Sequence, residues 1–350
     1  MDRNWIEQLF FNALRRVKPD FELTDETWEK LETVKDNCWP EIISRTEDII
    51  NKKAKQVLKN QRKDIALFKK SLVKRWGVAF DLLEHFIAFN LEYGMIVSES
   101  YRKNNKDVKF ETLIRLHARS CQMSFEILEL LKGGYADGAL ARWRSLYEIT
   151  VISKFLRDKP EELCQKYLDY SKVEGYQEAI EFQKNYVELE EEPLSDIELK
   201  ELEDEIQYLK TKYGEEFVKP YGWTAPYLDK SKRNFAGIES TLNIKYLRSY
   251  YKMANNYVHG GAKACLNVMG VYKQDKVMLA GPSNYGLADP AQLTALALFY
   301  TTFTLSGFEY YLEDDVYEEI AENMVSDIAK CFMGVQKQIE QEEDDNLEND

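Results

Sequence analysis

The sequence predicts an all-α protein, a multi-helix bundle, and three observations carry that prediction. Helix breakers are sparse, since the 350 residues include only 16 glycines and 8 prolines. Apolar residues recur at helical spacing over long stretches of the chain. Hydrophobic residues make up 44% and aromatic residues 13% of the composition, so the chain can bury a large core in one extended domain or two.

Residues 1–105 are predicted to form an N-terminal helical region with a long arm. A short amphipathic opening is indicated by three apolar residues at helical spacing: Trp5, Leu9 and Leu14. Thr24, followed by Asp25 and Glu26, has the composition of a helix start. After Pro40, neither a proline nor a pair of glycines interrupts the pattern up to residue 101, so we expect a long helix there.

A basic stretch lies within this long helix. Residues 52–75 contain ten basic residues and a single acid, Asp64. Such a stretch is typical of a solvated helix face. It is also typical of a surface that docks nucleic acid or an acidic tail, including the tail of this chain, so both interpretations stay open.

Residues 106–339 are predicted to form a helical core. Turn and cap residues divide it into a helix capped by Ser195 and helices over 110–132, 136–157, 160–187, 243–259, 290–312 and 317–340. The stretch 215–234 contains two prolines and several aromatic residues, and we expect a long loop of a kind that often carries function. Two short apolar runs near 266–280 are compatible with a small β-hairpin or an irregular excursion.

The net charge of −14 is concentrated in two acidic segments. Residues 188–205 contain ten acids and one base, and residues 340–350 contain seven acids and no base. The rest of the chain is close to neutral, so the overall acidity does not exclude an anionic partner. Residues 340–350 are predicted to be a disordered acidic tail.

Cysteine usage and hydropathy favour a cytoplasmic protein. The five cysteines are scattered and lack the spacing of a metal site, so we expect free thiols, no metal and no cofactor. No uninterrupted apolar stretch follows Met1, and we expect no signal peptide. The uncharged stretch 290–308 contains a glutamine and four threonines, so we expect a buried helix there and no membrane span.

The chain contains only three histidines, and one of them ends a predicted helix. On the helix over residues 243–259, four polar side chains fall on one side: Arg248, Tyr251, Asn255 and His259. Gly260 and Gly261 can stop the helix, which places His259 at a C-terminus where its protonated form is favoured. His259 is therefore a candidate general acid or base, and the alternative is a structural histidine that caps the helix.

A second candidate feature lies on the helix over residues 136–157. An apolar stripe runs along it through Leu140, Tyr147, Val151 and Phe155. Arg144 falls inside that stripe and Glu148 at its edge, whereas Arg142 points away. A charge pair directed at a core is costly unless it is satisfied. We therefore expect either a structural ion pair or a polar pocket in which Arg144 binds an anion such as phosphate and Glu148 orients it.

Three segments carry a resemblance to a known family: residues 134–148, residues 167–171 and residues 250–259. Together they resemble an uncharacterised bacterial family of unknown function, whose members have an Arg-x3-Glu helix and a late Tyr…His helix. The resemblance extends over approximately residues 60–310. It implies membership of that family and no particular activity.

The stretch from Asn255 to His259 and Gly260 also resembles the HEPN superfamily of helical bundles, whose signature is Arg-Asn-x-x-x-His. Many of its members are dimeric, metal-independent ribonucleases of toxin or antiviral systems. The resemblance therefore implies that the helical core over residues 106–339 is HEPN-like and that the protein forms a homodimer. It also implies that the partner is RNA or a protein of the same defence system. Ala254 stands where the signature has arginine, so the missing guanidinium would come from Arg144 on another helix.

Two functions follow from these features. The first is an intracellular HEPN-like effector, a metal-independent endoribonuclease of bacterial antiphage defence or of a toxin system. Its catalytic residues would be His259, Arg144 and Asn255, and its substrate-binding residues Glu148, Tyr251 and Arg248. The second is a non-catalytic helical binding or scaffold protein, whose polar pocket holds a small anionic ligand or a protein partner.

Overall fold

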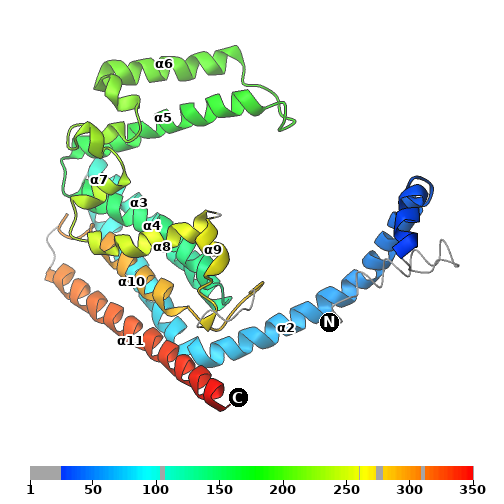
Figure 1. The fold of residues 1–350 in the computed structure, drawn as a ribbon. Coiled ribbons are helices and arrows are strands. Elements are labelled where there is room, and N and C mark those ends of the chain that lie inside the picture. Colours follow the sequence, from blue (N-terminus) through cyan, green and yellow to red (C-terminus); the bar gives the residue numbers. More distant parts are fainter. Residues whose placement is uncertain (1–24, 103–106, 260, 273–278, 309–311, 350) are drawn as a thin grey trace. The chain divides into compact units, whose positions relative to one another are not determined.

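The computed structural model describes residues 25–102, 107–259, 261–272, 279–308 and 312–349. Within these residues every regular element is a helix, so the predicted all-α class is confirmed (Figure 1). The α-helices are α2 (Asp25–Arg102), α3 (Val108–Lys132), α4 (Ala136–Arg157), α5 (Glu161–Asn185), α6 (Asp196–Tyr213), α7 (Phe235–Ser240), α8 (Arg248–Val258), α9 (Ala262–Leu266), α10 (Ala288–Thr302) and α11 (Leu312–Asn349).

Helix α2 is a long element that contributes to two compact units, Met1–Ser71 and Leu72–Asp350. The sequence predicts a boundary at residue 105. The two compact units divide after Ser71, and Leu72 and Trp76 already have no exposed surface in the second unit. The described part of the first unit is a single length of α2. The opening helix predicted in residues 1–24 lies outside the described residues.

The core of the second unit is built around α4. Helix α4 packs against α3, α8 and α10, and α10 packs in turn against α3 and α11 (Figure 1). The apolar stripe predicted on α4 is buried, and so is Trp143, whose indole N–H donates to the Leu293 carbonyl of α10 at 2.9 Å. Because close packing on several sides fixes the rotamers of α4, the charged side chains on this helix also have defined positions.

Local sequence explains where three of the helices begin. The carboxylate of Asp107 caps α3 by accepting a hydrogen bond from the backbone N–H of Lys109 at 2.7 Å. Pro160 directly precedes α5, and Ser195 forms a reciprocal capping box with Glu198 at the start of α6. These starts agree with the predicted helices to within a turn.

Helix α8 is shorter than the predicted helix over residues 243–259. A 3₁₀ turn, Lys245–Leu247, comes first, and α8 begins at Arg248 and ends at Val258. His259 has an extended backbone, with φ −108° and ψ 146°, but its N–H still donates to the carbonyl of Asn255 at 3.0 Å. The histidine therefore lies at the C-terminal end of the helix, as the sequence predicts.

The two closing helices differ from their predicted bounds. Helix α10 ends at Thr302, and α11 continues to Asn349 through an acidic segment whose composition predicts disorder. Tertiary contacts account for part of this order. Glu342 pairs with Arg75 at 2.5 Å, and Glu340 accepts a hydrogen bond from the hydroxyl of Tyr285 at 2.8 Å.

The region of the predicted β-hairpin near 266–280 contains no strand where the structure describes it. Helix α9 occupies residues 262–266, and turns and short irregular segments occupy residues 267–272. Residues 273–278 of that prediction lie outside the described residues.

The uncharged stretch 290–308 lies mainly in α10, which is buried within the second unit. Ala291 and Leu298 of this helix have no exposed surface. Among the described helices, none combines the length and the apolar character needed to cross a membrane.

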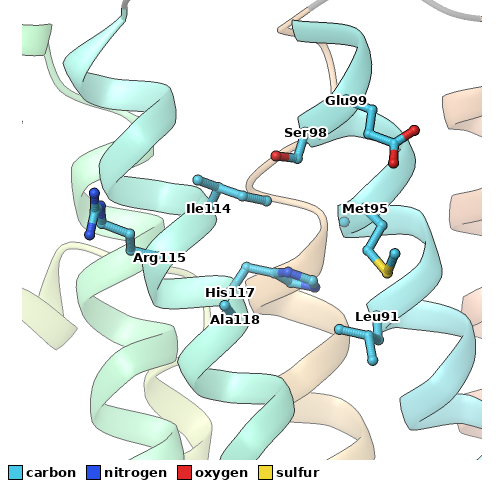
Figure 2. Close-up of a pocket in the computed structure, with 9 residues that line it drawn as sticks. Leu91, Met95, Ser98, Glu99, Ile114, Arg115, His117 and Ala118 are labelled. Carbon is cyan, nitrogen blue, oxygen red and sulfur yellow. The ribbon is translucent and has the colours of Figure 1, made fainter. Parts of the chain in front are cut away.

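The imidazole ring of His117 lies against Gly94 of α2, where the absence of a Cβ atom makes room for it. Figure 2 shows the imidazole between α3 and α2, close to Leu91 and Met95. A Cβ atom at position 94 would lie 2.3 Å from Cε1 and 2.6 Å from Nδ1 of His117. His117 is buried, with 2% of its surface exposed.

Gly94→Ala is therefore expected to lower the free energy of unfolding by about 1–3 kcal/mol, since the new methyl group forces the buried ring out of its position. Urea denaturation measures this change. Gly77→Ala on the same helix is the matched control, because its Cβ would approach only Cγ1 of Val73, at an ordinary contact distance of 3.4 Å. Equal losses in the two variants would contradict the steric explanation.

Candidate functional site

Helix α4 presents a charged pair one turn apart, Arg144 and Glu148. Arg144 Nη1 lies 3.2 Å from Glu148 Oε1, and the two side chains are 21% and 31% exposed. Arg142 of the same helix pairs instead with Glu126 of α3. The two arginines thus point to different neighbours, as the helical wheel predicts.

Helix α8 brings Tyr251 and Asn255 against this pair. Arg144 Nη2 donates to the Tyr251 hydroxyl at 2.6 Å, and Arg144 Nε donates to Asn255 Oδ1 at 2.5 Å. The Tyr251 hydroxyl donates in turn to Glu148 Oε1 at 2.7 Å. Four side chains that the sequence singles out therefore meet between α4 and α8, and we call Arg144, Glu148, Tyr251 and Asn255 the Arg144 cluster.

Aromatic packing fixes the position of Tyr251. Its ring stacks on Phe235 with the ring centres 4.7 Å apart, and the Arg144 guanidinium carbon lies 4.5 Å from the centre of the Tyr251 ring. Burial raises the pKa of the Tyr251 hydroxyl, and the carboxylate of Glu148 raises it further. The hydroxyl therefore stays protonated at neutral pH, when it donates to Glu148 and accepts from Arg144.

Arg248, which the sequence predicts to bind substrate, forms a second ion pair. Its Nη1 contacts Oε2 of Glu239 on α7, a carboxylate with only 1% of its surface exposed. The hydroxyl of Tyr147 donates to the other oxygen of Glu239 at 2.8 Å. Arg248 thus neutralises a buried carboxylate, and its guanidinium carbon lies 5.9 Å from the centre of the Tyr251 ring.

A further tyrosine near the cluster comes from the loop between α6 and α7. Tyr221 precedes the 3₁₀ turn Gly222–Thr224 and has a left-handed backbone with φ 54°, which is uncommon for residues other than glycine. Burial raises the pKa of Tyr221, the charge of Glu148 adds to the increase and the charge of Arg144 opposes it, so both charges are near its hydroxyl. The aromatic composition of the loop is the only signal in the sequence, because nothing in it relates position 221 to α4.

His259 lies at the exposed end of α8. Across the described part of the chain, no hydrogen bond or ion pair joins its imidazole to the side chains of the Arg144 cluster. The helix rises about 6 Å between Asn255 and His259, so the histidine follows the cluster by one turn. Of the three predicted catalytic residues, Arg144 and Asn255 are therefore in contact and His259 is their neighbour along α8.

Ala254, which stands where the HEPN signature has arginine, is a buried residue of α8. Ala254 has no exposed surface, so an arginine in its place would carry its charge into the packed core. Arg144 instead approaches the side chain of Asn255 from α4.

Two cavities lie in the second unit, and neither is lined by a residue of the Arg144 cluster. The larger, of about 360 Å³, is the space between α2 and α3 in which His117 is seen in Figure 2. Burial lowers the pKa of His117 to about 4 and raises that of Cys121, 3.5 Å away, to about 12. Both side chains are therefore uncharged at neutral pH.

The smaller cavity, of about 280 Å³, lies between α8, α10 and α11. Three methionines and two carboxylates are among the residues that line it: Met253, Met269, Met333, Asp289 and Glu340. Within the described residues, no group of three or more histidine, cysteine, aspartate or glutamate side chains is arranged to hold a metal ion.

No curated protein and no solved structure matches the chain. Residues 110–276 match a family of unknown function, DUF5677, and this range contains the whole Arg144 cluster, Tyr221, Glu239 and His259. The match lies inside the range over which the sequence resembles an uncharacterised family. The segment from residue 110 to residue 276 therefore belongs to the family of unknown function DUF5677.

Proposed function

We propose that the Arg144 cluster binds the phosphate group of a small ligand and that the protein is a binding protein. The observation that carries the proposal is the fixation of one guanidinium by three side chains from two helices, while a fifth of the Arg144 side chain stays exposed. An arginine held in this way loses little side-chain entropy when an anion binds.

The hydrogen-bond inventory of Arg144 supports this proposal. A guanidinium has five N–H donors, and the contacts to Asn255, Tyr251 and Glu148 use one on each of its three nitrogens. One N–H remains on each terminal nitrogen, and two such donors match two oxygens of a phosphate group. The amide NH₂ of Asn255 and the hydroxyl of Tyr221 are further donors in the neighbourhood.

The test is a calorimetric titration with inorganic phosphate and with adenosine 5′-monophosphate. Arg144→Lys keeps the charge but loses the planar fork, so it is expected to weaken binding by about tenfold or more. Arg142→Lys is the matched control, because Arg142 lies on the same helix with a similar exposure, 27%, and pairs away from the cluster.

Unchanged affinity in the control with a loss in Arg144→Lys supports the proposal. The proposal fails if wild-type protein binds neither probe, or if both lysine variants bind as the wild type does. Circular dichroism of each variant establishes that a loss of binding is not a loss of folding.

A metal-independent ribonuclease of the HEPN type is the second candidate, and one observation favours it. Arg144 reaches the asparagine of the Asn-x-x-x-His motif, and the exposed His259 directly follows the last residue of the same helix. His259 would then act as general acid or base on an RNA 2′-hydroxyl or leaving oxygen, with Arg144 stabilising phosphate charge.

Cleavage of a fluorescent single-stranded RNA in the presence of EDTA tests this candidate. Wild-type protein would cleave the RNA, and His259→Ala would be folded and at least about a hundredfold slower. If the protein is an effector in antiphage defence or a toxin, expression of the wild type should also arrest growth, whereas expression of His259→Ala should not. RNA left intact by the wild type would refute the ribonuclease and leave the binding protein.

A further inference from the structure

The first unit contains a length of α2 whose apolar face is uncovered. Between Ile43 and Ser71, every side chain is exposed or half-buried. Four large aliphatic residues, Ile43, Ile50, Leu58 and Ile65, are 42%, 38%, 44% and 37% exposed. Helices of globular proteins normally bury such residues, so this length of α2 has the composition of a helix with a partner.

The uncovered residues form one continuous stripe. At 3.6 residues per turn, the acidic Glu47 and eight uncharged positions fall within about 100° of the helix circumference; the eight are Ile43, Ile50, Ala54, Val57, Leu58, Gln61, Ile65 and Phe68. A spacing of eleven residues relates Ile43, Ala54 and Ile65, and a repeat of this length is typical of helices that pair in a right-handed supercoil. We call these eight positions the arm stripe.

The basic residues of the arm lie mainly on the other side. On the helical wheel, the side opposite the arm stripe carries Lys55, Lys59 and Lys63. The stripe can therefore be covered by a second apolar helix without burying these charges. From Ile43 to Phe68 the helix is about 38 Å long, which is ample for a stable helix pair.

We propose that two copies of the chain pair through the arm stripe, with the two arms antiparallel. Charge complementarity selects a second copy in this orientation. The arm is acidic near Glu47 and Asp48 and basic from residue 52 onward. A parallel pair would align the two basic segments along their whole length, whereas an antiparallel pair brings the acidic end of each copy beside the basic segment of the other.

A specific contact follows from the antiparallel arrangement. Glu47 lies among the positions of the arm stripe, near one edge, and Arg62 lies just beyond that edge. In an antiparallel pair centred near Ala54, the Glu47 carboxylate of one copy faces the Arg62 guanidinium of the other, and the twofold axis makes this contact twice.

Sedimentation equilibrium of the full chain tests the interface. The wild type is expected to have twice the monomer mass of 41.1 kDa. Ile65→Asp places a carboxylate in the stripe of both copies and is expected to weaken association by about a hundredfold or more. Leu67→Asp is the matched control: this residue is 58% exposed on the same arm but lies outside the stripe, so the variant should remain a dimer.

The orientation has its own test. Glu47→Arg is expected to weaken the dimer, and adding Arg62→Glu should restore it, because the exchanged charges again face each other. A monomeric wild type, or equal effects of Ile65→Asp and Leu67→Asp, would overturn the pairing. A dimer that the double variant fails to restore would overturn the antiparallel arrangement.

Discussion

Replacing Glu239 by alanine is expected to lower the free energy of unfolding by about 2 kcal/mol, because it removes a buried carboxylate to which two side chains donate. The carboxylate is 1% exposed and holds both Arg248 and the hydroxyl of Tyr147. Without it, the Arg248 guanidinium, whose side chain is 34% exposed, turns to solvent, and the buried hydroxyl of Tyr147 keeps only its longer bond to the Ile244 carbonyl, at 3.2 Å.

Urea denaturation of Glu239→Ala and of Glu216→Ala measures this effect against a matched control. Glu216 also pairs with two basic residues, Lys230 and Arg233, but its side chain is 46% exposed. Exposed pairs contribute little to stability, so Glu216→Ala should change the unfolding midpoint only slightly. If both variants are equally mild, Glu239 and Arg248 are not the buried structural pair described above.

Lowering the pH from 7 to 4 is expected to remove about 3 kcal/mol of stability through His117 alone. Burial lowers the pKa of this imidazole from 6.5 to about 4 in the folded protein. The unfolded chain therefore binds a proton below pH 6.5, whereas the folded chain binds it only near pH 4. Since the unfolded state holds more protons in this window, stability falls as the pH falls through it and levels off below pH 4.

The difference between wild type and His117→Gln isolates this contribution. Glutamine is neutral at every pH, and the carboxylates that titrate near pH 4 are present in both proteins. The unfolding free energy of the wild type should fall more steeply between pH 6.5 and 4 than that of the variant. Parallel pH profiles would show that the imidazole is hydrated or already charged in the folded state.

The sequence predicts the helices of the core and the inward direction of Arg144 because both depend on local periodicity. Capping residues and glycines set the bounds of α3 and α4, and the wheel separates Arg144 from Arg142. It also places Tyr251 and Asn255 on one side of α8. The contact between the two helices needs tertiary structure, which the pattern of one helix does not contain.

Two residues near the site, Glu239 and Tyr221, cannot be predicted from the local sequence either, because only tertiary structure brings them there. Glu239 lies nine positions before Arg248, in a separate short helix, and Tyr221 reaches the cluster through a loop with a left-handed residue. Composition also misleads where contacts decide the outcome. The acidic C-terminal segment has the charge density of a disordered tail, but Glu342 and Glu340 are tied to α2 and to Tyr285 within the second unit.

The wheel is misleading at one predicted catalytic residue. It places His259 on the same side as Asn255 on the assumption that the helix continues through residue 259. Helix α8 ends at Val258, and the extended backbone of His259 no longer projects its side chain along the helical direction. The imidazole is consequently exposed, and the contacts of the cluster are made without it.

The most direct test of the central claim is a ¹H–¹⁵N spectrum of the arginine Nε–H groups during a titration with inorganic phosphate. The signal that disappears in Arg144→Lys identifies Arg144. Binding at the Arg144 cluster predicts that this signal shifts and saturates with the added phosphate, while the Arg142 signal, assigned with Arg142→Lys, stays in place. An Arg144 signal that does not move at saturating phosphate would contradict the claim.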